Sequence, residues 1–512
     1  MNEKHVGFEV SRKMIFCKLN EANFEYDIYS LLKAFYPSED VKVSAEDMDT
    51  VEDADGGSAD DGAVDETVGE KTSGIILYDV EYTDDVLTVK GPAGERVYTI
   101  VYEHRPSTKN ILKKALYELL ALDTGRTLPW GTLTGIRPTK LTLGMIQGGY
   151  DDETIREHMK ETYLISDEKL DLSLEVSHRE AGLLSKIDLD NSYSLYIGIP
   201  FCPTRCLYCS FTAYPIGAWT SRVDAYLDAL EKELAWTASE YVAKGKVLST
   251  IYIGGGTPTS LGEEHLEKLL SMVDKYFDTR AILEYTIEAG RPDSITPEKL
   301  DIIKSHPITR ISINPQTMNQ KTLDLIGRHH TVGDIRRVYA MAREKGFDDI
   351  NMDLITGLPG ETLSDFEYTL SEIEKMAPDN LTVHSLALKH TSTLNIDKDK
   401  YDNYLIDNSQ THMDAGADLA KRLGLNPYYL YRQKNITANL ENIGYAREGA
   451  EGLYNILIME EVQDIVACGC GTACKKINPD KSTSRCENVK DVGLYIEKID
   501  EMIERKRQLF LD

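Results

Sequence analysis

From residue 193 to about residue 390, short apolar strands alternate with amphipathic helices. The strand candidates are residues 194–200, 249–256, 283–290, 309–315, 349–357 and 380–388. Helical periodicity lies between them, as in residues 222–245 and 363–377. Strands joined by crossover helices pair in parallel with right-handed connections. We therefore expect an α/β fold, with a partial (β/α)6 barrel over residues 193–390.

The flanking regions have different patterns. Residues 1–37 and 72–125 combine strand and helix signals and predict one small N-terminal α/β domain. The acidic segment 38–71 has few large apolar residues and no period, so we predict a disordered insert. We expect residues 126–192 to be a connecting segment with helices. Residues 391–512 are expected to be a C-terminal helical or mixed extension that covers the barrel.

Composition excludes several classes of partner. The 512-residue chain has a formal net charge of −28, which disfavours nucleic acid and an anionic membrane surface. The chain has no run of about 18 apolar residues, and its first residues lack a signal-peptide pattern. Eight cysteines are few for this length and are typical of reduced thiols. We expect a cytoplasmic protein of several domains.

Three of the cysteines lie in the stretch IPFCPTRCLYCSF, directly after the first barrel strand. Cys202, Cys206 and Cys209 have the spacing CxxxCxxC. Three thiolates at this spacing can bind three irons of a cubane [4Fe–4S] cluster and leave the fourth iron open for a small ligand such as S-adenosylmethionine. Structural zinc is the alternative, although the sequence offers no fourth ligand nearby.

Glycine-rich and polar motifs follow the later strands. GGGTP follows the second strand, EAGR the third, INPQ the fourth and DLITGLPG the fifth. Active sites of parallel sheets gather at the carboxyl ends of the strands, where these motifs lie. Glycines let the backbone approach a ligand closely. The alternative is that each motif is only a turn or a helix cap.

The motif CPTRCLYC resembles the CxxxCxYC signature of the radical S-adenosylmethionine (SAM) superfamily. The stretches YIGIPFC and GGGTP resemble the branch that contains oxygen-independent coproporphyrinogen III dehydrogenase. LPWGTLTGIRPTK and PYYLYRQKN resemble its HemZ-like subgroup. The resemblance extends from about residue 128 to the C-terminus.

The resemblance implies a role for each matching residue. Cys202, Cys206 and Cys209 would hold a [4Fe–4S] cluster. The residues implied to bind S-adenosylmethionine are Gly254, Gly255, Gly256, Thr257, Glu288, Gln316, Arg328 and Asp353. Tyr196 and Glu288 are the implied catalytic residues, and Tyr196 is otherwise an ordinary core aromatic. Arg137 and Lys140 are candidates for contacts with the propionates of a substrate, and the alternative is that their motif is a docking turn between domains.

The activity implied by the resemblance is oxidative decarboxylation of coproporphyrinogen III to protoporphyrinogen IX, with flavodoxin or ferredoxin as the electron donor. Phe211 and Gly198 stand where the best-known dehydrogenases have cysteine and histidine. Two alternatives therefore stay open, a haem-binding chaperone of the same family and another radical reaction on a tetrapyrrole. Cys468, Cys470 and Cys474 predict either an auxiliary cluster or a turn of small residues.

Overall fold

The computed structural model describes residues 13–37, 39–46, 75–211, 213–387, 392–396, 406–433 and 440–511. The chain divides into two compact units. The first comprises Met1–Pro138 and Gly148–Ser173, and the second comprises Thr139–Gln147 and Leu174–Asp512. Within the described ranges, no helix has the length and apolar character needed to cross a membrane.

The first unit is a five-stranded sheet with helices packed on it. Its strand order is β2-β1-β3-β4-β5. Strand β1 is parallel to β2 and β3, whereas β4 is antiparallel to both β3 and β5. Ile15, Leu31, Val80 and Leu116 belong to one buried apolar core. The elements are β1 (Met14–Leu19), α1 (Glu25–Phe35), β2 (Asp40–Ser44), β3 (Ile75–Tyr82), β4 (Val86–Gly91), β5 (Gly94–Thr99), α3 (Arg105–Thr124) and α5 (Asp152–Tyr163).

Strand β2 corrects the predicted acidic insert. Residues Asp40–Ser44 pair in parallel with β1, so the prediction of disorder from residue 38 onward is wrong for this strand. Val41 and Val43 pack against the apolar core, and the acidic residues around them concealed that alternation. The remainder of the predicted insert, residues 47–74, lies outside the described residues.

The second unit is built on an eleven-stranded sheet. Its order is β14-β15-β13-β12-β11-β10-β9-β6-β16-β17-β18. The strands from β6 to β13 in this order are parallel to one another, as predicted, and confirm the α/β class. They are β6 (Ser192–Ile199), β9 (Val247–Gly255), β10 (Glu284–Glu288), β11 (Arg310–Ser312), β12 (Ile350–Thr356) and β13 (Asn380–Ser385).

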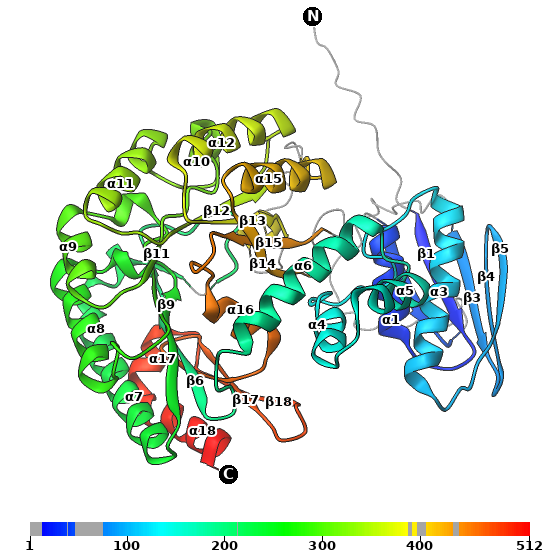
Figure 1. Ribbon diagram of the computed structural model, residues 1–512, viewed down its shortest axis with the longest axis horizontal. Coiled ribbons are helices and arrows are strands. Elements are labelled where there is room, and N and C mark those ends of the chain that lie inside the picture. Colours follow the sequence, from blue (N-terminus) through cyan, green and yellow to red (C-terminus); the bar gives the residue numbers. More distant parts are fainter. Residues whose placement is uncertain are drawn as a thin grey trace, which may run out of the picture. The chain divides into compact units, whose positions relative to one another are not determined.

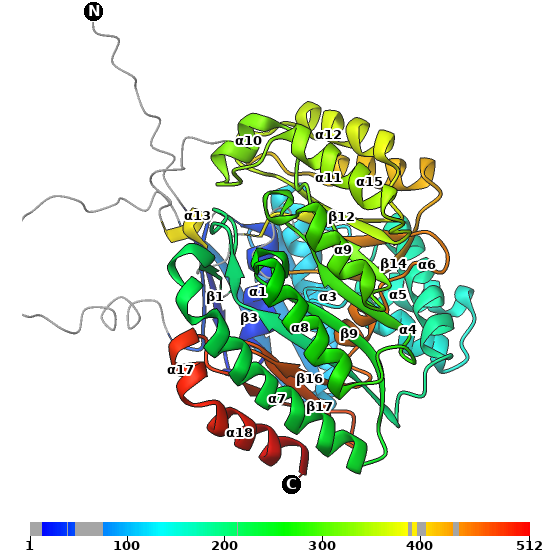
Figure 2. The same cartoon turned by 90° about the vertical axis from the view of Figure 1, so that its left-hand side faces the viewer.

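Helices cover the outer side of this curved sheet. Figure 1 shows α7, α8, α9, α11 and α12 around the outside, and Figure 2 shows α7, α8 and α9 in succession along that face. Capping boxes begin two of them, at Thr331 and Thr362. Helix α6 (Asp167–Leu184) begins in the first unit and continues into the second from Leu174. The other helices of the second unit are α4 (Lys140–Gln147), α7 (Val223–Ala243), α8 (Glu263–Tyr276), α9 (Pro297–Ser305), α10 (Gln320–Leu325), α11 (Val332–Glu344), α12 (Leu363–Met376), α13 (Thr393–Ile396), α15 (Gln410–Arg422), α16 (Leu453–Glu460), α17 (Val492–Glu497) and α18 (Ile499–Leu511).

The parallel strands alternate between aliphatic and polar or aromatic residues. In β12, for example, Met352 and Leu354 are fully buried. Asn351 and Asp353, which alternate with them along the strand, hydrogen-bond to each other. Because successive side chains point to opposite faces, the aliphatic set faces the outer helices and the polar set faces the inside of the curve. The polar or aromatic set comprises Ser194, Tyr196, Thr250, Tyr252, Glu284, Thr286, Glu288, Arg310, Ser312, Asn351, Asp353, Thr382 and His384.

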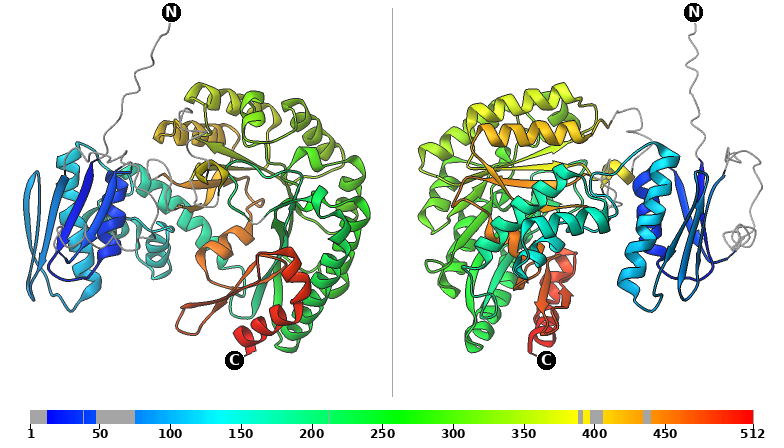
Figure 3. Two further views of the ribbon diagram at one scale, coloured as in Figure 1. Left: turned by 180° about the vertical axis from the view of Figure 1, so that it is seen from behind. Right: turned by 45° about the vertical axis from the view of Figure 1, so that its right-hand side comes forward.

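The C-terminal region extends both edges of the parallel sheet. At one edge, β15 (Asn442–Ala446) pairs antiparallel with β13, and β14 (Asn426–Tyr431) pairs antiparallel with β15. At the other edge, β16 (Asp464–Cys468) pairs in parallel with β6, and β17 (Ala473–Ile477) and β18 (Thr483–Glu487) form a hairpin beyond it. The hairpin lies beside α18, as Figure 3 shows. The sequence predicted a helical or mixed extension here, without locating these five strands.

Candidate functional site

The cysteine loop follows β6 and is tied down by hydrogen bonds. Phe201 and Cys202 form the short strand β7, which pairs with β8 (Tyr214–Pro215). The Thr204 hydroxyl donates to the Gly327 carbonyl at 2.9 Å, and the Leu207 amide donates to the Ile326 carbonyl at 3.0 Å. The segment just before Arg328 therefore fixes the middle of the loop.

The three thiols share a largely buried environment. Burial raises the pKa of Cys202 to about 11 and also raises the pKa of Cys209, although the Phe211 amide opposes the latter by hydrogen bonding to that sulfur. Among the described residues, no three Cys, His, Asp or Glu side chains converge closely enough to share one metal ion. A cubane cluster instead takes its three thiolates on three separate irons. Metal binding would displace the thiol protons.

Arg291 supports this loop, and the sequence interpretation missed it. Its Nη1 donates to the Cys206 sulfur at 3.3 Å, and its Nη2 lies 2.6 Å from the Asp293 carboxylate. The Arg291 side chain is only 3% exposed, so its charge acts without much solvent screening. Asp293 also contacts buried His330, and Arg291 and His330 lower the pKa of Asp293 against the opposing effect of burial. The strand-end motif EAGR contains Arg291 and was the available signal.

The glycines at the end of β9 adjoin the cysteine loop. A Cβ atom on Gly256 would lie 2.6 Å from the Phe201 carbonyl oxygen and 3.0 Å from the Cys202 sulfur. Gly255 has a φ of 103°, a conformation that L side chains rarely adopt. The Thr257 hydroxyl lies 3.4 Å from the Cys202 sulfur. The GGGT motif is thus a close-packed backbone surface beside the first cysteine.

Glu288 closes β10 and is linked to a group of stacked tyrosines. The Tyr252 hydroxyl donates to Glu288 Oε1 at 2.6 Å. Burial raises the pKa of Glu288 to about 7, and the nearby charge of Asp353 adds to this effect. The Tyr252 and Tyr454 rings stack 4.7 Å apart, and the Tyr196 ring lies about parallel to both, at 6.0 and 5.9 Å. Tyr196 therefore lies with the other inward residues and not in an outer aliphatic layer.

Gln316 has an unusual backbone. Its φ is 67°, in the left-handed region that costs a residue with a side chain about 1 kcal/mol or more. Hydrogen bonds with β12 hold it there, since its amide donates to the Asp353 carbonyl and its carbonyl accepts from Ile355. The side-chain Oε1 is buried and has no hydrogen-bond partner in the described part of the chain. This strained residue presents an acceptor in need of a donor.

Arg328 explains the tyrosine of the CLYC motif. The guanidinium donates from Nη1 to the Asn314 carbonyl at 2.6 Å and also hydrogen-bonds to the Tyr208 hydroxyl. Arg328 is 4% exposed, and its Nε has no hydrogen-bond partner among the described residues. The charges of Tyr208 and Cys206 raise the pKa of Arg328 against the effect of burial.

Asp353 begins a second chain of polar contacts. The sequence interpretation identified Asp353 but neither of the residues that follow it in this chain. Asp353 Oδ2 lies 3.7 Å from His384 Nε2, and His384 Nδ1 lies 3.3 Å from the Tyr431 hydroxyl. Although burial opposes it, the nearby His384 side chain and a hydrogen bond from Asn351 lower the pKa of Asp353. Alternation along β13 would have indicated His384 as an inward residue.

The two positions that depart from the family pattern have local explanations. A Cβ atom on Gly198 would lie 2.4 Å from Cγ2 of Thr472, so the turn after β16 closes this position to a side chain. Phe211 is 65% exposed, so its ring does not fill the interior beside Cys209. Arg137 belongs to the first unit and Lys140 begins α4 of the second, and neither is among the side chains grouped above.

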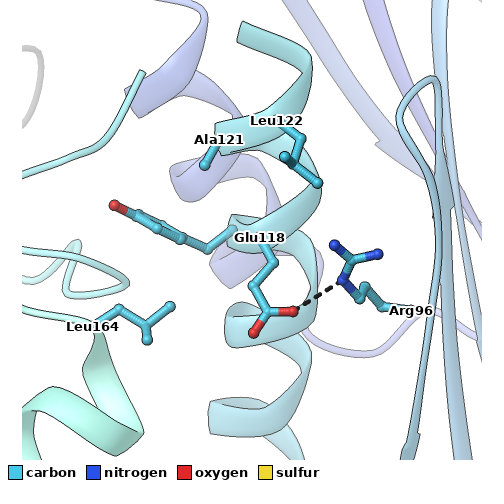
Figure 4. A pocket seen from close by; sticks show the side chains of 6 residues that line it. Arg96, Glu118, Ala121, Leu122 and Leu164 are labelled. Atoms are coloured by element: carbon cyan, nitrogen blue, oxygen red, sulfur yellow. Dashed lines mark hydrogen bonds and ion pairs between the residues drawn. The ribbon is translucent and has the colours of Figure 1, made fainter. Parts of the chain in front are cut away.

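A separate depression lies in the first unit. It has a volume of about 350 Å³ and is lined by Arg96, Tyr117, Glu118, Ala121, Leu122 and Leu164. Figure 4 shows the ion pair between Arg96 and Glu118, whose Nε and Oε2 atoms are 3.0 Å apart. The lining holds no thiol or imidazole, and no predicted site residue contributes to it.

The chain is similar in sequence to proteins of a known family. Residues 196–373 match the radical SAM superfamily. The chain is 44% identical over 410 residues to the oxygen-independent coproporphyrinogen-III oxidase-like protein HemZ of Bacillus subtilis, which covers 78% of this chain and 82% of that protein. It is 40% identical over 197 residues to the haem chaperone HemW of B. subtilis, covering 38% of this chain and about half of HemW, 51%. The solved coproporphyrinogen III oxidase HemN of Escherichia coli aligns with a TM-score of 0.49 and 24% identity over 63% of this chain and 73% of that one.

The HemZ match extends well beyond the superfamily domain and spans most of both proteins. It confirms the family predicted from the cysteine loop and its flanking motifs. The chain belongs to the HemZ family of radical SAM proteins.

Proposed function

We propose that this protein catalyses the oxygen-independent oxidative decarboxylation of coproporphyrinogen III to protoporphyrinogen IX. The observation that carries the proposal is the grouping of three thiols with polar strand-end residues in one unit, in a chain 44% identical to a coproporphyrinogen-III oxidase-like protein. The substrate is a tetrapyrrole with propionate side chains, and the electron donor is a reduced flavodoxin or ferredoxin.

The cofactors of the superfamily are a [4Fe–4S] cluster and S-adenosylmethionine. Three features of the second unit fit them: three thiols in one loop, the close-packed GGGT backbone and the buried Oε1 of Gln316, which has no hydrogen-bond partner among the described residues. Cys202, Cys206 and Cys209 would hold the cluster, and Gly254 to Thr257 would lie beside the bound S-adenosylmethionine. When bound, the two cofactors supply a carbon-centred radical that removes a hydrogen atom from a propionate.

The protein's own side chains orient the reactants in this proposal. Gln316 Oε1 would accept a hydrogen bond from a donor of S-adenosylmethionine. The Glu288 carboxylate would accept a second one, and the Tyr252 hydroxyl fixes the direction of this carboxylate through their 2.6 Å hydrogen bond. Arg328 compensates negative charge near Cys206, with which it interacts electrostatically. Such preset contacts lower the cost of ordering the reactants.

The tyrosine group gives the inside of the sheet an aromatic wall. Tyr196, Tyr252 and Tyr454 stack within 6.0 Å of one another, and such a surface can pack against the flat pyrroles of a substrate. The Asp353, His384 and Tyr431 chain lies on the far strands and offers polar contacts for a propionate or for S-adenosylmethionine. Aromatic packing with a few polar anchors is typical of small-molecule sites.

The test uses anaerobically reconstituted, full-length protein with coproporphyrinogen III, S-adenosylmethionine and reduced flavodoxin. We expect mass spectrometry to show loss of two carbon dioxide molecules, conversion of two propionates to vinyls, and 5′-deoxyadenosine. The matched control carries Cys202→Ala, Cys206→Ala and Cys209→Ala and should form none of these products.

One outcome would overturn the assignment. The cluster-loaded protein would cleave S-adenosylmethionine but leave coproporphyrinogen III intact, and it would bind haem stoichiometrically. That result would support the chaperone alternative, for which the 40% identity to HemW is the supporting observation. A decarboxylated product other than the divinyl tetrapyrrole would instead indicate a different radical reaction.

A further inference from the structure

Two cysteines of the C-terminal hairpin face each other. Cys474 of β17 and Cys486 of β18 are directly opposite in the antiparallel register. Both thiols are free, and they hydrogen-bond to each other. Directly opposed residues have Cβ atoms about 4.5–5.5 Å apart, and a disulfide needs about 3.5–4.5 Å. A small closure of the hairpin would allow a bond between the two sulfurs.

The two thiols differ in accessibility. Cys474 is 1% exposed, and the Ala467 amide donates to its sulfur at 3.2 Å. Cys486 is half-buried, so small reagents can reach it from the surface of the hairpin. This combination of one accessible thiol with one buried partner is typical of pairs that react by thiol–disulfide exchange.

Charged groups of α18 and α7 surround the pair. Lys506 is 1% exposed and pairs with the fully buried Glu233, whose Oε1 lies 2.5 Å from Lys506 Nζ. Lys506 Nζ also lies 3.6 Å from the Cys468 sulfur. The hydrogen bond from Cys474 lowers the pKa of Cys486, and Lys506 and Arg505 add to this effect against burial and Glu233. Burial raises the pKa of Cys474.

The other cysteines of this region have separate partners. The Cys470 thiol donates to the Val489 and Lys490 carbonyls at 3.3 and 3.1 Å. The Cys468 sulfur lies 3.4 Å from the Thr237 hydroxyl. Among the described residues, Cys474 and Cys486 are thus the thiols that face each other, while Cys468 and Cys470 contact other groups.

We propose that Cys474 and Cys486 are a redox-active pair that becomes a cross-strand disulfide by exchange with a low-molecular-weight disulfide. The Cys486 thiolate attacks the small disulfide, whose sulfur–sulfur bond breaks and releases one small thiol with the Cys486 proton. Cys474 then loses its proton and attacks the Cys486 sulfur, which releases the second small thiol. The two protein thiols together lose two electrons and two protons, and the small disulfide gains them to become two thiols.

The pair lies one strand away from the proposed catalytic wall. The Ala467 amide of β16 donates a hydrogen bond to the Cys474 sulfur, and Ala467 is the register partner of Tyr196 in β6. Tyr196 also packs against the apolar cluster that contains Cys474. Oxidation of the pair would therefore change the packing directly behind a residue of the candidate site.

The experiment treats the full-length, cluster-loaded protein anaerobically with oxidised glutathione and then unfolds it in denaturant with N-ethylmaleimide, so that every remaining free thiol is blocked. We expect peptide mass spectrometry to find residues 474 and 486 linked, with a mass lower by two hydrogens, and to find both alkylated after reduction. Cys474→Ser should accumulate the glutathione adduct on Cys486. Cys486→Ser should leave Cys474 without a glutathione adduct, because that thiol is buried. Cys470→Ser is the matched control and should form the disulfide as the unchanged protein does.

Two results would overturn the proposal. One is that Cys474 and Cys486 of the unchanged protein stay fully alkylatable after treatment that oxidises other accessible thiols. The other is that Cys474 forms a glutathione adduct equally fast with and without Cys486. The first readout uses the unchanged chain, so it holds even if a variant fails to fold. Thermal melting of each variant identifies such a failure.

Discussion

The Nη1 of Arg291 donates a hydrogen bond to the sulfur of Cys206 at 3.3 Å from a position that is 3% exposed. The same guanidinium forms an ion pair with Asp293 and donates to Thr204 in the cysteine loop. A buried positive charge is therefore in direct contact with a proposed iron ligand. Such contacts set the reduction potential of an iron–sulfur cluster.

We predict that Arg291→Gln lowers the reduction potential of the reconstituted cluster by tens of millivolts. Reduction adds negative charge next to Cys206, and the variant removes the positive charge that stabilises it. Redox titration followed by electron paramagnetic resonance measures the shift. Arg291→Lys keeps the charge and should shift the potential less. Equal shifts in the two variants would contradict an electrostatic role.

The binding of S-adenosylmethionine should tighten about tenfold between pH 6 and pH 8. The pKa of Glu288 is about 7, so the carboxylate that we propose as a hydrogen-bond acceptor goes from mostly protonated to mostly ionised over this range. Equilibrium binding to the anaerobic, cluster-loaded protein measures the affinity. Glu288→Gln keeps an acceptor for Tyr252 and should remove most of the pH dependence.

The same raised pKa affects folding stability with a defined sign. Below pH 4.5, the ordinary pKa of this group, Glu288 is protonated in both the folded and the unfolded chain. As the pH rises from there to about 7, the unfolded chain loses this proton first, so the free energy of unfolding falls. The free energy of unfolding of Glu288→Gln should fall less over this pH range than that of the unchanged protein. An identical pH profile in the two proteins would contradict the raised pKa.

We predict that Gly256→Ala reduces the iron and sulfide content of the reconstituted protein. The added methyl would meet the Phe201 carbonyl at 2.6 Å and the Cys202 sulfur at 3.0 Å, so the cysteine loop must move. Overpacking of this kind costs about 1–3 kcal/mol. Gly262→Ala is the matched control, because its nearest contact would be His265 at 3.9 Å. If Gly262→Ala lost iron to the same extent, the contacts of the added methyl at residue 256 would not explain the loss.

Gly198 and Thr472 should be energetically coupled. Gly198→Ala places a methyl 2.4 Å from Thr472 Cγ2, and we expect it to lower the free energy of unfolding by about 1–3 kcal/mol. Thr472→Ala removes the opposing atom, so the double variant should lose less than the sum of the two single variants. Urea unfolding of all four proteins gives the coupling energy. Simple additivity would show that Thr472 does not close this position.

The parallel strands and the cysteine loop could be predicted because their signals are local. Apolar runs such as Ile251 to Ile253 and the CxxxCxxC spacing lie within short windows of sequence. Strand-end motifs also predicted where polar residues would gather, including Glu288 and Gln316. These features depend on backbone periodicity and on the parallel order of the strands.

The partners of these residues could not be predicted, because they come from distant segments. Tyr454 stacks on Tyr252 from a helix about 200 residues further along the chain. Tyr431 reaches His384 from an antiparallel strand that the sequence did not indicate. The backbone strain of Gln316 has no sequence signal, because β12 imposes it through hydrogen bonds. Tertiary contacts determine these parts of the site.

The order of strands in the large sheet has a consequence for synthesis of the chain. Strand β6 carries Tyr196 and leads into the cysteine loop, but one of its two neighbours, β16, begins roughly 270 residues after β6 begins. At about 5–20 residues per second, translation needs roughly 13–50 s to supply that neighbour. During this interval β6 is an open sheet edge in the nascent chain. The three cysteines are thus made early, and the wall behind them is completed near the end of translation.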